Sequence, residues 1–221
     1  MKCYCYETET DFVLLVENAE PKHIDTILHA WFVKTKRGYE KTYPKNGEDK
    51  LWHKNSADKE LIKKNFARLG QSMFSGVFDW KSVLTALAQK FLENKIQWYI
   101  FGSCCEAVRG VKITPNDIDI IVHTSDFYKV KELFPDNIVE PFVDNHGTWL
   151  VRYFGRLCLG GAIVDIAADE KLNMENHPYE NLTWNGFEVF AEPFHKRYKI
   201  ETERGRENRL KAMREYMDLT K

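Results

Sequence analysis

The N-terminal third of the chain has three successive patterns of apolar and polar residues: an apolar run, a helical spacing and a charged stretch. The apolar run Phe12–Val16 predicts a strand, and apolar residues recur at helical spacing after Pro21, which suits a first helical turn. The stretch Lys34–Asn55 is charged, lacks an apolar period and is interrupted by glycine and proline, so we expect a long surface loop there. The pattern does not indicate what this part of the chain does.

The periodicity is stronger further along the chain. A helix is expected from Ser56 or Asp58, and a more regular one follows Asp79, with apolar residues every three or four positions through Leu92. Such an apolar face must pack on a sheet or on another helix. Runs rich in β-branched and aromatic residues predict strands at Ile96–Phe101, Asp117–Val122 and Gly161–Ile166, and a pair of strands within Trp149–Leu159.

Composition narrows the class of protein. The 221 residues are 43% hydrophobic and 14% aromatic, which supports a packed core and excludes disorder. The 32 basic and 33 acidic residues nearly balance, which argues against a nucleic-acid partner bound through general phosphate neutralisation. The sequence contains no signal peptide and no apolar run long enough to span a membrane, so we expect a cytoplasmic protein. The five cysteines are expected to be reduced thiols.

The first candidate for chemistry is a set of carboxylates. Asp117 and Asp119 lie two apart in a predicted strand, so both project from one face, where they repel each other. Mg²⁺ is the simplest compensation, because it prefers carboxylate oxygens and is completed by substrate phosphates. The alternative is a strand end whose two carboxylates face water or cap a turn. Asp165 lies in an apolar strand, where it either joins the same site or is neutralised by a nearby arginine or lysine.

The second candidate is a turn that binds phosphate. Gly102-Ser103 separates a strand from a short helix expected at Cys104–Val108. Glycine lets the backbone approach an anion, and the first amides of a helix point toward it. The Ser103 hydroxyl and Arg109 are candidates for further hydrogen bonds to phosphate. The alternative is an ordinary strand-to-helix turn in which Ser103 caps the helix.

Taken together, these segments resemble the nucleotidyltransferase superfamily of the DNA polymerase β type. The preceding helix is similar to the one that leads into the core of lincosamide and aminoglycoside nucleotidyltransferases. The resemblance covers about residues 76–170. It rests on which motifs are present and on the order in which they follow one another along the chain. The segments that carry it are Trp98–Ser103, Arg109-Gly110, Pro115–Val122 and Ile163–Ile166.

The resemblance implies an α/β (α+β) fold with a mixed sheet flanked by helices and the active site at its edge. It divides the chain into an N-terminal extension (1–75), a nucleotidyltransferase core (76–192) and a basic amphipathic C-terminal helix (193–221). Catalysis and binding of Mg²⁺, with two ions expected, are assigned to Asp117, Asp119 and Asp165. The residues assigned to the nucleotide are Gly102, Ser103, Arg109 and Lys199.

The implied reaction moves a nucleoside monophosphate from a nucleoside triphosphate to a hydroxyl of a small molecule or protein, releasing pyrophosphate. Arg109-Gly110 comes later than in many small members, and Gly102-Ser103 stands where the lincosamide type has Gly-Gly. Two alternatives remain open. One is an inactive nucleotide-binding or regulatory protein, such as a toxin–antitoxin partner, and the other is a binding module with a structural cation. We expect the N-terminal extension to shape the acceptor side or a subunit contact, which leaves a homodimer open.

Overall fold

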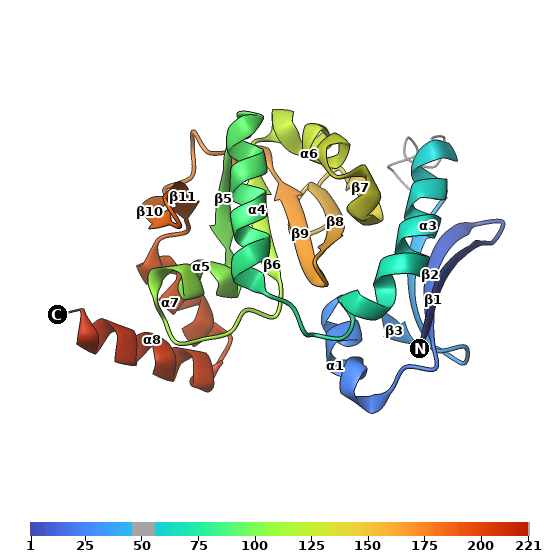
Figure 1. Cartoon of the computed structure of the whole chain (residues 1–221), viewed down its shortest axis with the longest axis horizontal. Helices are drawn as coiled ribbons and strands as arrows, with labels where there is room; N and C mark the ends of the chain where they lie inside the picture. Colours follow the sequence, from blue (N-terminus) through green and yellow to red (C-terminus); the bar gives the residue numbers. More distant parts are fainter. Residues whose placement is uncertain (46–55, 221) are drawn as a thin grey trace.

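The computed structural model describes residues 1–45 and 56–220, and within them the strands form two sheets. The larger sheet has seven strands in the order β10-β11-β5-β6-β9-β8-β7, and it is mixed because β11 pairs with β5, and β6 with β9, in parallel. The smaller sheet is antiparallel, with the order β1-β2-β4-β3. The two sheets lie side by side along the long axis of the molecule (Figure 1). The expected mixed sheet with flanking helices is confirmed.

The larger sheet is built from the middle and C-terminal parts of the chain. Its strands are β5 (Trp98–Phe101), β6 (Ile118–Val122), β7 (Ile138–Asp144), β8 (Tyr153–Leu159), β9 (Ala162–Ala168), β10 (Glu180–Trp184) and β11 (Phe187–Ala191). The helices around it are α4 (Trp80–Glu93), α5 (Gly102–Arg109), α6 (Phe127–Leu133), α7 (Phe194–Glu203) and α8 (Glu207–Leu219). Short 3₁₀ turns lie at Thr124–Asp126, Pro135–Asn137 and Glu170–Leu172.

The N-terminal part of the chain forms the smaller sheet and two helices. Its elements are β1 (Lys2–Glu7), β2 (Asp11–Glu17), α1 (Pro21–His29), β3 (Val33–Lys34), β4 (Tyr39–Pro44) and α3 (Ser56–Met73). The surface loop expected over Lys34–Asn55 is wrong where it includes β4, which pairs with β2 along its whole length. Its alternating Tyr-Glu-Lys-Thr-Tyr sequence is a strand pattern, and the neighbouring glycine and proline mark its ends. Residues 46–55 of that expected loop lie outside the described residues.

The strand pair expected within Trp149–Leu159 is also wrong. Only β8 is a strand there, and its partner toward the sheet edge is β7, which lies before the loop at 145–152. The apolar pattern of 149–151 belongs to a tight connection held by hydrogen bonds, including Asn145 N–H to the Arg152 carbonyl at 2.8 Å. The hydrophobic residues in this loop therefore have a role other than strand pairing.

The single C-terminal helix expected over 193–221 is two helices. Gly205 has φ +62°, a left-handed conformation that ends α7, and the chain then turns into α8. The turn between them holds two arginines, Arg204 and Arg206. Its position relative to the sheet decides what those charges can contact.

One hydrophobic core joins the two sheets. It includes Phe12, Leu14 and Phe66 from the N-terminal part together with residues of β6, β9 and α4.

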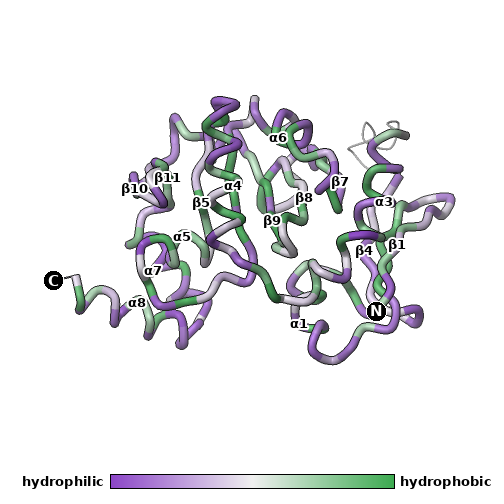
Figure 2. Tube along the Cα trace, in the orientation of Figure 1, coloured by the Kyte–Doolittle hydropathy of each residue, from purple (hydrophilic) through white to green (hydrophobic). Residues whose placement is uncertain are grey.

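Asp79 caps α4 by accepting hydrogen bonds from the amides of Lys81 and Ser82. Apolar residues follow the central strands and α4, whereas α7 and much of α8 are hydrophilic (Figure 2). Among the described residues, no helix combines the length and apolar character needed to cross a membrane.

The N-terminal part also contacts the larger sheet through α3. The buried side chain of Asn65 donates to the carbonyls of Pro135 and Ile138, at 2.8 and 3.0 Å. These bonds satisfy the backbone at the beginning of β7, so α3 bridges the small sheet and the edge of the large one. The N-terminal extension is therefore held in a defined place beside β7 and β8.

Phe66 tests this shared core. Its ring is fully buried, 6.0 Å from that of Phe32 and 6.2 Å from that of Phe74. We expect Phe66→Ala to lower the free energy of unfolding by about 3–5 kcal/mol, because the cavity cannot close. Leu92→Ala is the control, since that side chain is 69% exposed on α4, and its effect should stay within about 0.5 kcal/mol. Equal effects in urea unfolding would contradict the shared core.

Candidate active site

The three carboxylates singled out in the sequence meet at one edge of the larger sheet. Parallel pairing of β6 and β9 places Asp119 directly beside Asp165. Asp117 lies one residue before β6, so it enters the site from the preceding loop. One carboxylate oxygen from each residue lies within 4.8 Å of the others. The backbone register therefore brings the three carboxylates of this acidic triad together.

Burial makes the acidic triad electrostatically costly. Removal from water, with the neighbouring charges of Asp117 and Asp165, raises the pKa of Asp119 well above its ordinary value. The positive charges of Arg197 and Arg156 act in the opposite direction without cancelling this effect. Three hard oxygen ligands that repel one another are a suitable set for Mg²⁺, which would replace their repulsion by attraction. The donor set therefore fits the expected metal.

Gly102 explains how the triad can lie against a helix. It has φ +64°, and a Cβ atom at this position would overlap Oδ2 of Asp119. Glycine is required here both by the backbone conformation and by the carboxylate next to it. Helix α5 begins at Gly102, and Ser103 is 4% exposed, so the first turn of α5 faces the same cleft. The residue that precedes α5 is Phe101, and no side chain caps the helix. The alternative in which Ser103 is the N-cap is therefore wrong.

The acidic triad and the first turn of α5 line a cleft of about 300 Å³. Four arginines from α7, from α8 and from the turn between these helices line the same cleft: Arg197, Arg204, Arg206 and Arg209. The cleft is also lined by Asn116 from the loop before β6 and by two residues of the N-terminal part, His29 and Trp31. Negative and positive groups therefore face one another across a small volume.

The arginines differ in how firmly they are held. Arg197 is fully buried and bonds to Glu106 at 2.9 Å and to Glu201 at 2.6 Å. Arg209 also contacts Glu201, at 3.2 Å. Arg204 is exposed, and among the residues that the structure describes no acidic partner is recorded for it. Arg204 is thus available to an anion that enters the cleft.

Asp165 has an arginine partner. Neutralisation by a nearby arginine or lysine is one of the two alternatives that the sequence leaves open for this residue. Arg156 is cross-strand to Asp165 and donates to both of its oxygens, from Nε at 2.5 Å and from Nη2 at 2.8 Å. Arg156 is 1% exposed and lies on the β8 side of Asp165, and it does not line the cleft between the carboxylates. The ion pair therefore orients Asp165 without filling the space where a cation would bind.

A buried network connects this arginine to the N-terminal sheet. Arg156 Nη1 donates to Glu140 at 2.6 Å and to the Ala30 carbonyl at 2.9 Å. Glu140 also accepts from Lys41 and from the Tyr43 hydroxyl, each at 2.5 Å. Burial alone would raise the pKa of Glu140, but the charges of Arg156 and Lys41 keep it below the ordinary value. These contacts hold Arg156 in place.

The N-terminal part also contacts the triad directly. Nε2 of His29, at the end of α1, lies 2.7 Å from Oδ2 of Asp117. This hydrogen bond is the main reason that the pKa of His29 is raised above its ordinary value. No residue of the N-terminal part was among the expected site residues, because 88 positions separate this pair and no local pattern links them.

Two expected nucleotide-binding residues lie elsewhere. Arg109, at the far end of α5, is bound to Glu180 at 2.7 Å and does not line the cleft. Lys199 points to solvent, with 78% of its side chain exposed, and lies 3.9 Å from Glu203. Arg197, two residues earlier on α7, faces inward instead. The basic stretch was visible in the sequence, but the packing of α7 and α8 decides which of its members reach the site.

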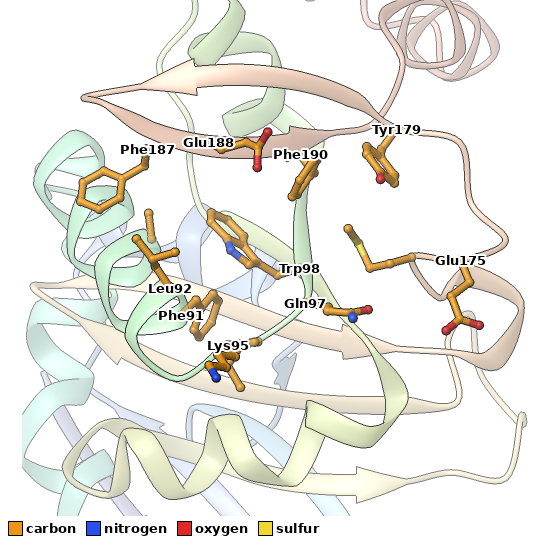
Figure 3. A pocket seen from close by; sticks show the side chains of 13 residues that line it. Phe91, Leu92, Lys95, Gln97, Trp98, Glu175, Tyr179, Phe187, Glu188 and Phe190 are labelled. Atoms are coloured by element: carbon orange, nitrogen blue, oxygen red, sulfur yellow. The ribbon is translucent and has the colours of Figure 1, made fainter.

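A larger cavity, of about 500 Å³, lies at the opposite end of β5 (Figure 3). Trp98, Phe187 and Phe190 line it, where β5 and β11 pair only through Ile100 and Ala191. Its charged lining residues, Lys95, Glu175 and Glu188, are separated around an aromatic interior. It contains none of the triad, so the smaller cleft is the candidate active site.

Comparison with known proteins gives structural similarities only. No protein-family model matches the chain, and no curated protein gives a significant match. An inferred nucleotidyltransferase from Thermotoga maritima is similar in structure, with 17% identity over 62% of this chain and 91% of that one, at a TM-score of 0.46. An antigenic nucleotidyltransferase-like protein from Paracoccidioides brasiliensis is 16% identical over 60% of this chain and 74% of that one, at a TM-score of 0.39.

A third similar structure is ANT(2")-Ia in complex with adenylyl-2"-tobramycin. It is 10% identical over 62% of this chain and 88% of that one, at a TM-score of 0.43. The first two of these structures carry the name nucleotidyltransferase or nucleotidyltransferase-like, the class that the sequence resembles. Overlap at this level does not define an activity, which depends on the residues of the cleft.

Gly102→Ala tests the contact between the turn and the triad. The substitution strains a left-handed residue and forces the Asp119 carboxylate to move. Gly205→Ala is a matched control, because Gly205 has φ +62° and nothing lies within 4 Å of its added Cβ. We expect Gly102→Ala to cost about 1–3 kcal/mol more than the control in chemical unfolding. Equal costs would show that the carboxylate does not depend on glycine here.

Proposed function

We propose that this protein is a Mg²⁺-dependent nucleotidyltransferase. It would move a nucleoside monophosphate from a nucleoside triphosphate to a hydroxyl of a small molecule or protein, with release of pyrophosphate. The observation that carries the proposal is the acidic triad, with one oxygen of each carboxylate within 4.8 Å of the others, in a cleft that the first turn of α5 and four arginines also line. This combination provides for the metal, the phosphates and their charge in one place.

The nucleotide would lie across β5 and β6. The amides at the beginning of α5 and the Ser103 hydroxyl are donors for the terminal phosphates. Arg204 adds a positive charge on the same side, and Arg197, held by its buried carboxylates, keeps that side of the cleft positive. The α-phosphate would then lie over Asp117 and Asp119, which with Asp165 would hold Mg²⁺; the ion, when bound, would supply positive charge to the phosphate oxygens.

The acceptor hydroxyl would meet the nucleotide at Asp165. Its oxygen attacks the α-phosphorus while the bond from that phosphorus to the bridging oxygen of the β-phosphate breaks. The hydroxyl proton passes to the Asp165 carboxylate, and pyrophosphate leaves on the opposite side. Arg156 holds Asp165 through two hydrogen bonds, so the base stays oriented toward the cleft side of β9 during transfer.

Asp119→Asn tests the metal and the reaction together. We expect release of pyrophosphate and transfer of label from an α-³²P-labelled nucleoside triphosphate to fall by at least about 100-fold, because the metal loses a charged ligand. Acceptors in the assay are aminoglycosides, lincosamides, aryl glycosides and proteins. Binding of nucleotide to the wild-type protein without any release of pyrophosphate would favour the inactive regulatory alternative.

The same variant gives a stability readout that needs no acceptor. Because the pKa of Asp119 is raised in the folded state, its ionisation lowers stability as pH rises above the ordinary carboxylate value. Asp119→Asn should therefore have a higher Tm than wild type at pH 7 without Mg²⁺, and Mg²⁺ should raise the Tm of wild type but not that of Asp119→Asn. Asp136→Asn is the control, since Asp136 is exposed and far from the cleft. A Tm response to Mg²⁺ in Asp119→Asn would contradict the assigned metal site.

Arg204 and Lys199 form a matched pair for the nucleotide site. Arg204 lines the cleft, whereas Lys199 lies on the outer side of α7. In calorimetry with α,β-methylene-ATP and Mg²⁺, Arg204→Ala should weaken binding about 10-fold, as expected for one charge-assisted hydrogen bond, and Lys199→Ala should leave it unchanged. The reverse result would restore Lys199 as the phosphate ligand.

A further inference from the structure

The order of strands arranges the cleft along one direction. Gly102 follows the end of β5, where the Arg197 guanidinium lies 5.1 Å from the ring centre of Phe101; Asp119 is on β6, Asp165 is on β9 and Phe154 is on β8. Neighbouring strands are about 4.8 Å apart, so these groups follow one another across the sheet. In phosphoryl transfer the attacking and leaving oxygens are roughly in line. With pyrophosphate on the arginine side, the acceptor must come from the β8 side, an inference that rests on the proposed function.

Three aromatic side chains pack together on that side, and we call them the aromatic shelf: Trp31, which lines the cleft, and Trp149 and Phe154, which contact Trp31. The ring of Trp149 is 4.3 Å from that of Trp31 and 5.0 Å from that of Phe154, edge-on in both cases. The planes of Trp31 and Phe154 are nearly parallel, 6° apart, with centroids separated by 6.3 Å. Trp31 remains 45% exposed and lines the cleft with the triad.

Trp31 is held in this place in a strained backbone conformation. It has φ +69°, a left-handed conformation in which a bulky residue is rare, at the end of α1 where glycine is usual. Its N–H donates to the Leu28 carbonyl at 2.9 Å, which keeps the helix-ending turn closed. The indole is half-exposed, so core burial does not compensate for this strain. Strain of this kind that is retained near a reactive cleft is typical of a binding position.

The charges around the aromatic shelf restrict what it can bind. The Lys41 ammonium lies 5.8 Å from the ring centres of both Trp31 and Phe154, and the Arg156 guanidinium lies 5.5 Å from that of Phe154. These cations are paired with Glu140 and Asp165, and they already occupy the aromatic rings that a ligand's ammonium group would need. An amino sugar with several ammonium groups is therefore disfavoured, whereas a flat uncharged ring can stack on the exposed indole.

We propose that the aromatic shelf binds a flat aromatic part of the acceptor and presents the acceptor's hydroxyl to Asp165. The acceptor class is then a hydroxyl compound with an uncharged aromatic ring, in contrast to a polycationic aminoglycoside. Trp31 comes from the N-terminal extension, which would thereby determine acceptor specificity while the triad and arginines bind the nucleotide.

Calorimetry with three probes tests this assignment: 4-nitrophenyl β-D-glucopyranoside, methyl β-D-glucopyranoside and tobramycin. The two glucosides share their hydroxyls and differ in the aryl group. Wild type should bind the aryl glucoside at least about tenfold more tightly than the methyl glucoside, with tobramycin no tighter than the latter. Equal binding of the two glucosides, no binding of the aryl glucoside, or a preference for tobramycin would overturn the proposal.

Trp31→Gly is the informative variant, because glycine accepts the left-handed conformation and the protein should fold at least as well. It should lose the tenfold preference and bind α,β-methylene-ATP with Mg²⁺ within twofold of wild type. Trp184→Ala is the control, since Trp184 stacks on Trp80 outside the cleft, and it should keep the preference. A retained preference in Trp31→Gly would overturn the assignment. Loss of nucleotide affinity would instead place the nucleobase on the shelf, and would overturn it too.

The two proposals fail in distinguishable ways. Binding of the glucosides needs no turnover and is measured with and without the nucleotide analogue. Absence of pyrophosphate release from wild type, together with an aryl preference that depends on Trp31, would contradict the transfer reaction and retain the aromatic shelf as a binding site. Label transfer that does not depend on Trp31 would retain the reaction and overturn the shelf.

Discussion

The mutual repulsion of three carboxylates is the constraint around which the cleft is organised. Side chains that repel each other do not gather by themselves, and here the hydrogen bonds between β6 and β9 hold Asp119 beside Asp165. Gly102 leaves room for the Asp119 carboxylate, and Arg156 and His29 each bind one of the other two. The sheet provides the rigidity that such a strained, functional arrangement requires.

The near-neutral charge of the whole chain conceals a strong local separation of charge. The acidic triad occupies the centre of the cleft, and the arginines of the turn between α7 and α8 occupy one side. Buried glutamates hold Arg197 and partly neutralise its neighbours, which leaves Arg204 as the freest positive group. A nucleoside triphosphate carries most of its negative charge on the β- and γ-phosphates, to one side of the reacting α-phosphorus, so this separation matches its shape.

The N-terminal part of the chain is bound to the site through charges as well as through the core. Glu140, itself fully buried, accepts from Lys41, Tyr43 and Arg156, and Arg156 in turn orients Asp165. Removing one member of such a network leaves an unpaired buried charge, which is far more costly than losing a surface ion pair. The extension is therefore structurally coupled to the residue that would receive the acceptor's proton.

The sequence by itself determined the features that depend on neighbouring residues: the strands that carry Asp119 and Asp165, the glycine turn after Phe101, and the helix that begins after Asp79. Period-two and helical spacings, caps and turns are local, so they can be read along the chain. Only the tertiary structure decided that Arg204 and not Lys199 lines the cleft, that Arg109 turns away, and that His29 and Trp31 reach it. Those placements depend on how whole elements pack, and contacts such as His29 with Asp117 join residues 88 positions apart that share no local pattern.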